Sequence, residues 1–187
     1  MHSLESLLGI RPKLKRLFFI YRFIIIILIN RQAAQGSAEA KDSRRTCPMV
    51  QLIVGKKGKG KTKCLLDKVN TEVKNILGNV VYLDKDTAHM YELNNKIRLI
   101  SVPDFGISTT EEFIGFVLGI ISQDHDLEQM YFDSFLIISD LKGKDIVPSI
   151  RRIREISEKY GVDFVLSVSM DESEIPEEIK PLIAISL

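Results

Sequence analysis

The chain has 187 residues, of which 45% are hydrophobic and 27% charged, a composition that fits one globular domain and excludes a largely disordered protein. Its net charge of +1 hides an asymmetry, because residues 1–48 carry a balance of +6 and residues 49–187 a balance of −5. The acidic body argues against nucleic acid as an obligatory partner, since binding to a phosphate backbone requires a basic face. The two cysteines, Cys47 and Cys64, form no CxxC pair, which argues against a disulfide framework or a structural zinc site and favours a reduced, cytoplasmic protein.

Residues 1–48 form an N-terminal extension with a basic start and an apolar run, Leu17–Ile29, that Arg22 interrupts. As a helix this run would rise about 20 Å, less than the ~30 Å of a hydrocarbon core. Three interpretations stay open: a signal peptide, a tether to the cytoplasmic face of a membrane, and an upstream segment that is not part of the functional protein. We favour the third, because a strand-like run follows Met49 at once. A membrane is then expected as a partner only if residues 1–48 are native.

From Val50 onward, apolar runs of strand length alternate with segments of helical period. This pattern predicts an α/β fold with a mostly parallel sheet of about five strands and helices on both faces. The runs are continuous rather than alternating, which indicates strands buried on both faces. We expect strands at Val50–Val54, Val80–Leu83, Ile97–Val102, Phe135–Ser139, Phe164–Val168 and Leu182–Ser186.

Three helices are expected between these strands. The first is Thr62–Leu77, with Gly78 as its stop, and another is Pro148–Tyr160, with Gly161 as its stop. Thr109 and Glu112 predict a capping box for a helix that runs to Ser122.

The segment Phe113–Ile121 within that helix is apolar almost all round, with Gly115 and Gly119 four residues apart. Nine residues cannot span a bilayer. A central buried helix is the first interpretation, and a contact within a homo-oligomer is the second.

A phosphate-binding motif lies between the first strand and the first helix. Gly55-Lys56-Lys57-Gly58-Lys59-Gly60-Lys61-Thr62 matches the pattern G-x-x-x-x-G-K-[ST]. The glycines let the backbone turn so that successive N–H groups point at phosphate oxygens, and the following helix directs its positive end at the same anion. Lys61 is expected to reach the β- and γ-phosphates as a catalytic residue, and the Thr62 hydroxyl to ligate Mg²⁺. The motif therefore predicts that residues 49–187 form a three-layer P-loop NTPase domain that binds ATP with Mg²⁺.

Such a site also needs an acid at the end of a neighbouring buried strand, to hold the metal through water. Asp140 follows the expected strand Phe135–Ser139, and we assign it this catalytic and metal-binding role. Asp84 and Asp86 lie just past the second strand, on the ligand side of a parallel sheet, and could contact metal or form a plain polar turn. Further candidates that could sense the γ-phosphate are Ser167 and Ser169.

Hydrolysis is less strongly indicated than binding. Many ATPases place a Glu directly after the metal-binding Asp to activate water, but Leu141 follows Asp140 here. A cluster of arginines could supply a charge-stabilising finger to a neighbouring subunit, or could be the solvated face of a helix: Arg151, Arg152 and Arg154.

The stretch Met49–Leu187 resembles a group of short P-loop proteins often labelled as twitching-motility (pilus-retraction) ATPases. The resemblance implies a P-loop fold and ATP binding. The motor function carries over poorly, because a retraction motor is a much larger two-domain enzyme whose acidic and histidine motifs are not found here. The matching segments are Val50–Thr62, Asn79–Asp84 with Asp86, Phe132–Phe135 and Ser157–Ser169.

The loop is also similar to that of the chromosome-partition and division-site ATPases, which carry a lysine after the first glycine, as Lys56 does here, and an Asp-x-Asp after the second strand, as in Asp84-Lys85-Asp86. Lys57 stands where that class has glycine. Three functions follow as hypotheses: a slow Mg²⁺-dependent ATPase with a regulatory or assembly role, a small-molecule kinase of the nucleoside type, and a nucleotide-binding module without turnover.

Overall fold

The computed structural model describes residues 49–187, so the interpretations of residues 1–48 lie outside the described residues. Within the described part, six strands form one sheet in the order β3-β2-β4-β5-β1-β6, and every neighbouring pair is parallel. The expected α/β class and parallel sheet are confirmed at this level, with one strand more than the approximate number predicted. The strands are β1 (Val50–Val54), β2 (Asn79–Asp84), β3 (Ile97–Ser101), β4 (Leu127–Phe132), β5 (Asp163–Val168) and β6 (Ile183–Ser186).

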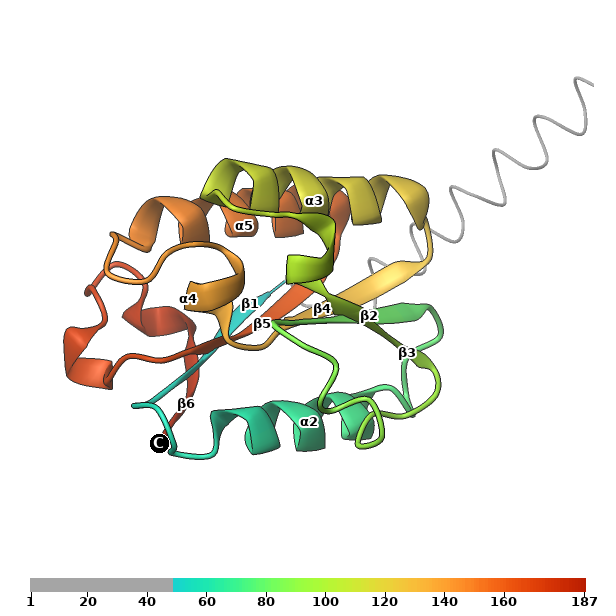
Figure 1. Cartoon of the computed structure of the whole chain (residues 1–187), viewed down its shortest axis with the longest axis horizontal. Coiled ribbons are helices and arrows are strands. Elements are labelled where there is room, and N and C mark those ends of the chain that lie inside the picture. Colours follow the sequence, from blue (N-terminus) through green and yellow to red (C-terminus); the bar gives the residue numbers. More distant parts are fainter. Residues whose placement is uncertain (1–48) are drawn as a thin grey trace, which may run out of the picture. The chain divides into compact units, whose positions relative to one another are not determined.

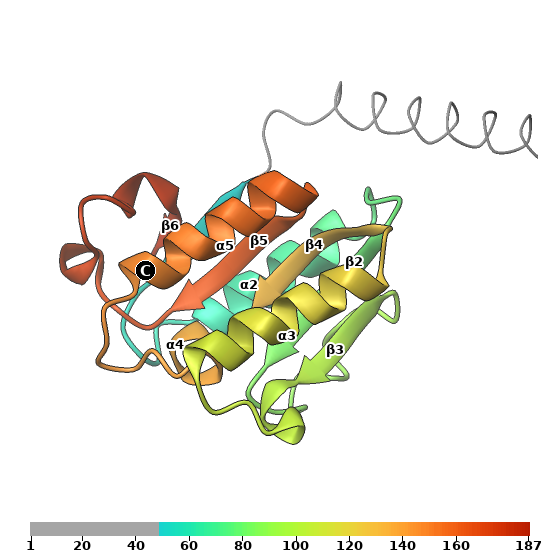
Figure 2. The same cartoon turned by 90° about the horizontal axis from the view of Figure 1, so that it is seen from above.

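Helices cover both faces of the sheet. Figure 1 shows α3 (Thr110–Gln123) and α5 (Val147–Tyr160) above the sheet and α2 (Lys61–Glu72) below it. Seen from above in Figure 2, α3 and α5 run side by side across the sheet, with α2 behind it. The remaining helical pieces are the four-residue α4 (Phe135–Ile138) and the 3-10 turns η2 (Val102–Phe105), η3 (Glu172–Glu174) and η4 (Lys180–Leu182).

Successive side chains along each strand point to opposite faces of the sheet, so the interior is divided into two hydrophobic cores, one on each face. One set of strand side chains, including Leu83 and Phe132, packs with α3, α4 and α5. The other set, including Tyr82 and Tyr131, packs with Leu65 and Val69 of α2. Because the strands are parallel, all of their carboxyl ends meet at one edge, where loops from both layers can form a site.

One predicted strand is wrong and one observed strand was missed. Phe135–Ser139 is not a strand, because Phe135–Ile138 forms the short helix α4. The fourth strand is instead Leu127–Phe132, in which Glu128 and Gln129 are only partly buried. These two polar residues break the apolar run that would have identified the strand. Ser134, in the left-handed conformation with φ of 51°, turns the chain out of the sheet before α4 begins.

Gly78 has a different role from the helix stop that the sequence suggested, because α2 ends at Glu72, with Val73 as its C-cap. A Cβ atom at Gly78 would lie 2.0 Å from the backbone oxygen of Asp126. Only glycine allows this close approach, which brings the chain into β2 beside the loop before β4.

The capping box at Thr109 and Glu112 is confirmed at the start of α3. The interpretation of Phe113–Ile121 as a central buried helix is wrong, because Gly115 and Gly119 are exposed and only one side of α3 packs on the sheet. Among residues 49–187, no helix has the length and apolar character needed to cross a membrane.

Candidate functional site

The segment Gly55–Thr62 joins the end of β1 to the start of α2 at the carboxyl edge of the sheet. The Gly55 N–H donates to the carbonyl of Met170 over 2.8 Å, which ties the loop to the segment after β5. Gly58 and Gly60 both have φ of 88°, in the left-handed region that favours glycine. The glycine spacing of the motif therefore corresponds to real turns of the backbone.

Gly55 is required for a further reason. Its φ is 146°, and a Cβ atom added to it would lie 2.8 Å from the backbone oxygen of Leu187. The Leu187 N–H in turn donates to the carbonyl of Val54 over 3.1 Å. The last residue of the chain thus packs against the first residue of the loop, and a side chain there would separate them.

Lys61, the first residue of α2, is folded back into the loop. Its side-chain Nζ donates to the carbonyl of Lys56 over 2.9 Å, and only 7% of the residue is exposed. Burial lowers the pKa of Lys61, and the nearby Asp133 carboxylate partly opposes this effect. A buried ammonium group whose hydrogen-bond partner is a loop carbonyl is well placed to exchange that partner for an anion.

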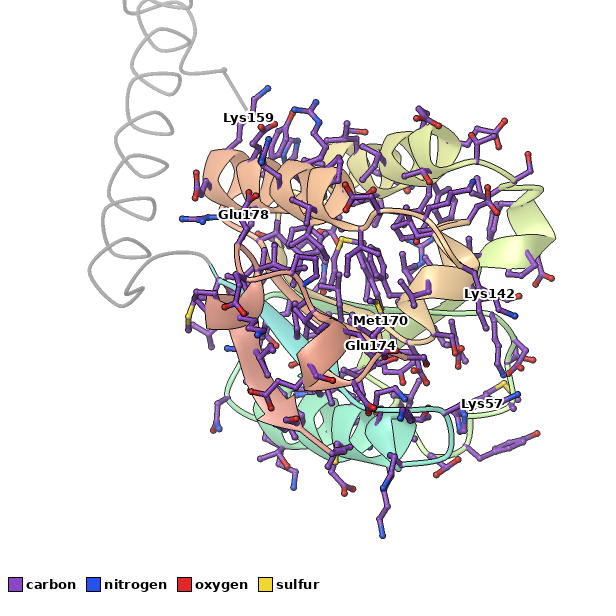
Figure 3. All side chains as sticks on the ribbon, turned by 90° about the vertical axis from the view of Figure 1, so that its left-hand side faces the viewer. Lys57, Lys142, Lys159, Met170, Glu174 and Glu178 are labelled. Atoms are coloured by element: carbon purple, nitrogen blue, oxygen red, sulfur yellow. The ribbon has the colours of Figure 1, made fainter. Side chains whose placement is uncertain are left out.

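The other loop lysines are not equivalent to Lys61. Lys56 forms an ion pair with Asp171 at 2.6 Å, and this hydrogen bond raises the pKa of Lys56. Lys57 and Lys59 are exposed, and Lys57 lines the cavity next to the loop. Figure 3 shows Lys57 on the loop and Lys142, another cavity residue, on the segment after α4.

The assignment of the partner carboxylate to Asp140 is not supported, because it assumed that a strand ends there. Asp140 follows α4 instead, has a side chain that is 52% exposed, and forms an ion pair with Lys144 at 2.5 Å. It is not among the residues that line the cavity.

The residue that occupies the expected position is Asp133, directly after β4. It is 2% exposed and lines the same cavity as Lys61 and Thr62. Its Oδ1 accepts hydrogen bonds from the Ser134 N–H at 2.7 Å and from the Ser167 hydroxyl at 2.5 Å. Sequence reasoning assigned this residue no role, although the apolar run Met130–Phe132 directly before it was an available signal.

Of the secondary candidates, Ser167 lines the cavity, whereas Asp84 does not line it but lies beside Asp133. Asp84 is the last residue of β2 and is 1% exposed. Burial and the neighbouring Asp133 carboxylate raise the pKa of Asp84 to about 6. Ser169 lines the cavity, whereas Asp86 is a turn residue whose side chain accepts from Lys85 and from the Ala88 N–H.

Lys61, Thr62, Asp133 and Ser167 line a cavity of about 670 Å³ at the carboxyl edge of the sheet. That volume lies within the range of small-molecule sites. Its lining combines basic groups, acidic and hydroxyl groups, and two apolar residues of α4. The residues are Lys57, Gly58, Gly60, Lys61, Thr62, Lys85, His89, Asp133, Ser134, Leu136, Ile137, Lys142, Ser167 and Ser169.

The arginine cluster does not reach this cavity. On the exposed side of α5, Arg152 and Arg154 pair with Glu155 and Glu158 of the same helix, and Arg151 pairs with Glu178, which lies between η3 and η4. In this chain they behave as the solvated face of that helix.

Comparison with known proteins adds no assignment. No protein-family model matches the chain. A search of curated proteins likewise finds no match to its sequence.

Proposed function

We propose that the chain binds a nucleoside triphosphate, ATP in the first instance, together with Mg²⁺, and hydrolyses it slowly in a regulatory or assembly role. The observation that carries this proposal is the meeting of Gly55–Thr62, the buried Lys61 and the buried Asp133 around one cavity. A flexible basic turn would not bury its lysine or face it with a carboxylate.

The loop supplies donors for phosphate oxygens. The left-handed glycines at 58 and 60 change the direction of the backbone twice just before α2, and the first turn of α2 holds no acidic residue that would compete with an anion. α2 has 12 residues, long enough for a helix dipole whose positive end favours negative charge. Phosphate oxygens would replace the Lys56 carbonyl as the partner of the Lys61 ammonium.

The acidic side of the cavity fits a magnesium ion. Thr62 offers a hydroxyl in the first turn of α2. Among the described residues, Asp133 Oδ2 accepts one long hydrogen bond, from the Tyr82 hydroxyl at 3.4 Å. Strand β5 lies between β1 and β4, so the two backbones are about 10 Å apart, and Asp133 would hold the ion through water. When bound, Mg²⁺ would neutralise charge on the phosphate oxygens.

Slow turnover follows from the residue after Asp133. Ser134 occupies the position where a water-activating Glu would stand, and its N–H is already committed to Asp133 and Ser167. The same observation favours the second candidate, a nucleotide-binding module without turnover. The apolar wall of Leu136 and Ile137 could contact a nucleoside base, or the acceptor of a small-molecule kinase.

Phosphate release separates these functions. We expect slow, Mg²⁺-dependent release of phosphate from ATP by the wild type and none by Lys61→Ala, with Lys63→Ala as a matched control on the exposed side of α2. Nucleotide binding without any phosphate release would exclude the ATPase and support the binding module without turnover. Phosphate transfer to an added nucleoside, without release to water, would indicate the kinase.

A further inference from the structure

Three side chains that bind metals well lie close together beside the cavity, and two of them, His89 and Asp133, line it. Asp84 ends β2, His89 lies in the turn that follows it, and Asp133 follows β4. One potential ligand atom from each lies within 4.8 Å of the other two. The cluster thus combines two carboxylates and an imidazole from segments that are far apart in the sequence.

The Asp84 carboxylate is incompletely satisfied. Its Oδ1 accepts the Lys85 N–H at 2.6 Å, but its buried Oδ2 has no hydrogen-bond partner among the described residues. A buried polar atom without a partner costs stability and therefore calls for an explanation, of which a bound ion is one. Two lysines that line the cavity have other partners, because Lys85 Nζ pairs with Asp86 and Lys61 Nζ donates to the Lys56 carbonyl.

Each of the other two side chains is held mainly through one atom. Asp133 Oδ1 accepts two short hydrogen bonds, whereas among the described residues Oδ2 accepts one long hydrogen bond, from the Tyr82 hydroxyl at 3.4 Å. His89 Nδ1 lies 2.7 Å from Glu92 Oε1. With Nδ1–H donated to Glu92, the lone pair of His89 is on Nε2, and a carboxylate that orients a metal-binding histidine in this way is a common second layer of metal sites.

We propose that Asp84, His89 and Asp133 bind a divalent first-row transition metal ion of the Zn²⁺ type, and that they do so without nucleotide. Imidazole favours such ions over Mg²⁺, and three protein ligands leave one position for water. Ligand atoms around a tetrahedral ion at about 2.1 Å are about 3.4 Å apart. The ligand atoms, which lie within 4.8 Å of one another, would therefore move closer by at most about 1.4 Å.

This site goes beyond the proposed function because it does not need the phosphate loop. In the strand order β2-β4-β5-β1, the loop strand β1 lies three spacings, or about 14 Å, from the strand that ends in Asp84. The two sites share Asp133, but Asp84 and His89 have no part in the magnesium site described above.

Calorimetric titration of the chelator-treated full chain with Zn²⁺, without nucleotide, tests the proposal. We expect one ion per chain, with affinity lowered at least tenfold in both Asp84→Asn and His89→Gln. His125→Gln and Asp140→Asn serve as matched controls, because both residues are exposed and outside the cluster, and they should bind as the wild type does.

A titration with Co²⁺ supplies a second readout, since loss of a nitrogen ligand changes its visible absorption. Urea unfolding of each variant shows whether it is folded. The proposal is overturned if the folded wild type binds no Zn²⁺, or if His89→Gln binds Zn²⁺ as tightly as the His125→Gln control. Because nucleotide is absent, these outcomes are independent of whether the chain binds ATP.

Discussion

Replacing Asp84 with asparagine should stabilise the metal-free protein. The carboxylate is 1% exposed, faces Asp133, and has one oxygen without a partner among the described residues. Ionisation of Asp84 in this position is therefore unfavourable, and its pKa is raised from 3.8 to about 6. An asparagine has nearly the same shape, removes the charge, and can donate an N–H to Asp133.

The size of the effect follows from the raised pKa of Asp84. A pKa of about 6 in the folded state, against 3.8 in the unfolded state, corresponds to about 3 kcal/mol of lost stability once the group is ionised in both states. Because the pKa of Asp84 is higher in the folded state than in the unfolded state, ionisation of Asp84 lowers the free energy of unfolding. The folded protein binds more protons between the two values, so its stability falls as pH rises from about 4 to about 6 and then levels off.

Urea unfolding in a chelator measures this directly. The free energy of unfolding of Asp84→Asn should exceed that of the wild type by about 3 kcal/mol at pH 7 and by less than about 1 kcal/mol at pH 4. Asp86→Asn is the matched control, because its hydrogen bond with Lys85 lowers the pKa of Asp86, and no gain is expected from its removal. An equal gain at both pH values, or a loss of stability at pH 7, would refute the reasoning.

Two further predictions concern particular residues. Gly78→Ala should lower the free energy of unfolding by about 3 kcal/mol, near the upper end for overpacking, because its Cβ would meet the Asp126 oxygen at 2.0 Å. Gly115 lies in the exposed face of α3, with open space where a Cβ would be added, so Gly115→Ala should raise the free energy of unfolding by about 0.5–1 kcal/mol. Urea unfolding of both glycine variants tests this prediction, and equal effects of the two substitutions would contradict it. Asp133→Asn should reduce the Mg²⁺-dependent part of ATP affinity about tenfold or more, whereas Asp140→Asn should leave it unchanged, as measured by ATP titrations at several Mg²⁺ concentrations; a loss confined to Asp140→Asn would restore the original assignment.

The sequence predicted most accurately those elements that depend on neighbouring residues or that form apolar runs of strand length. The glycines of the loop, the capping box at Thr109 and the end of α5 at Gly161 each depend on contacts within a few residues, and the structure has all three elements. Strands β1, β2, β3, β5 and β6 were visible as short, mainly apolar runs, with ends displaced by one residue at most. The edge strand β6 is only half-buried, contrary to the expectation that the strands are buried on both faces.

The missed acid shows where this reasoning fails. β4 carries Glu128 and Gln129 in its first half, while the more apolar Phe135–Ile138 forms a helix because Ser134 turns the chain away from the sheet. Apolar content alone therefore selected the wrong segment as a strand, and led to Asp140 rather than to Asp133, the acid that follows the observed strand. The Asp84–His89–Asp133 cluster depends on strand order, which no local pattern in the sequence reveals.

The central claim is that the loop and Lys61 bind the phosphates of a nucleotide. Calorimetric titration of the full chain with ATP and Mg²⁺ tests it most directly, with Lys61→Ala as the comparison and Lys63→Ala as the control. We expect one binding event per chain in the wild type and in Lys63→Ala, and a loss of at least tenfold in affinity in Lys61→Ala. No heat of binding from a folded wild type, confirmed by a displacement assay with a fluorescent ATP analogue, would contradict the account.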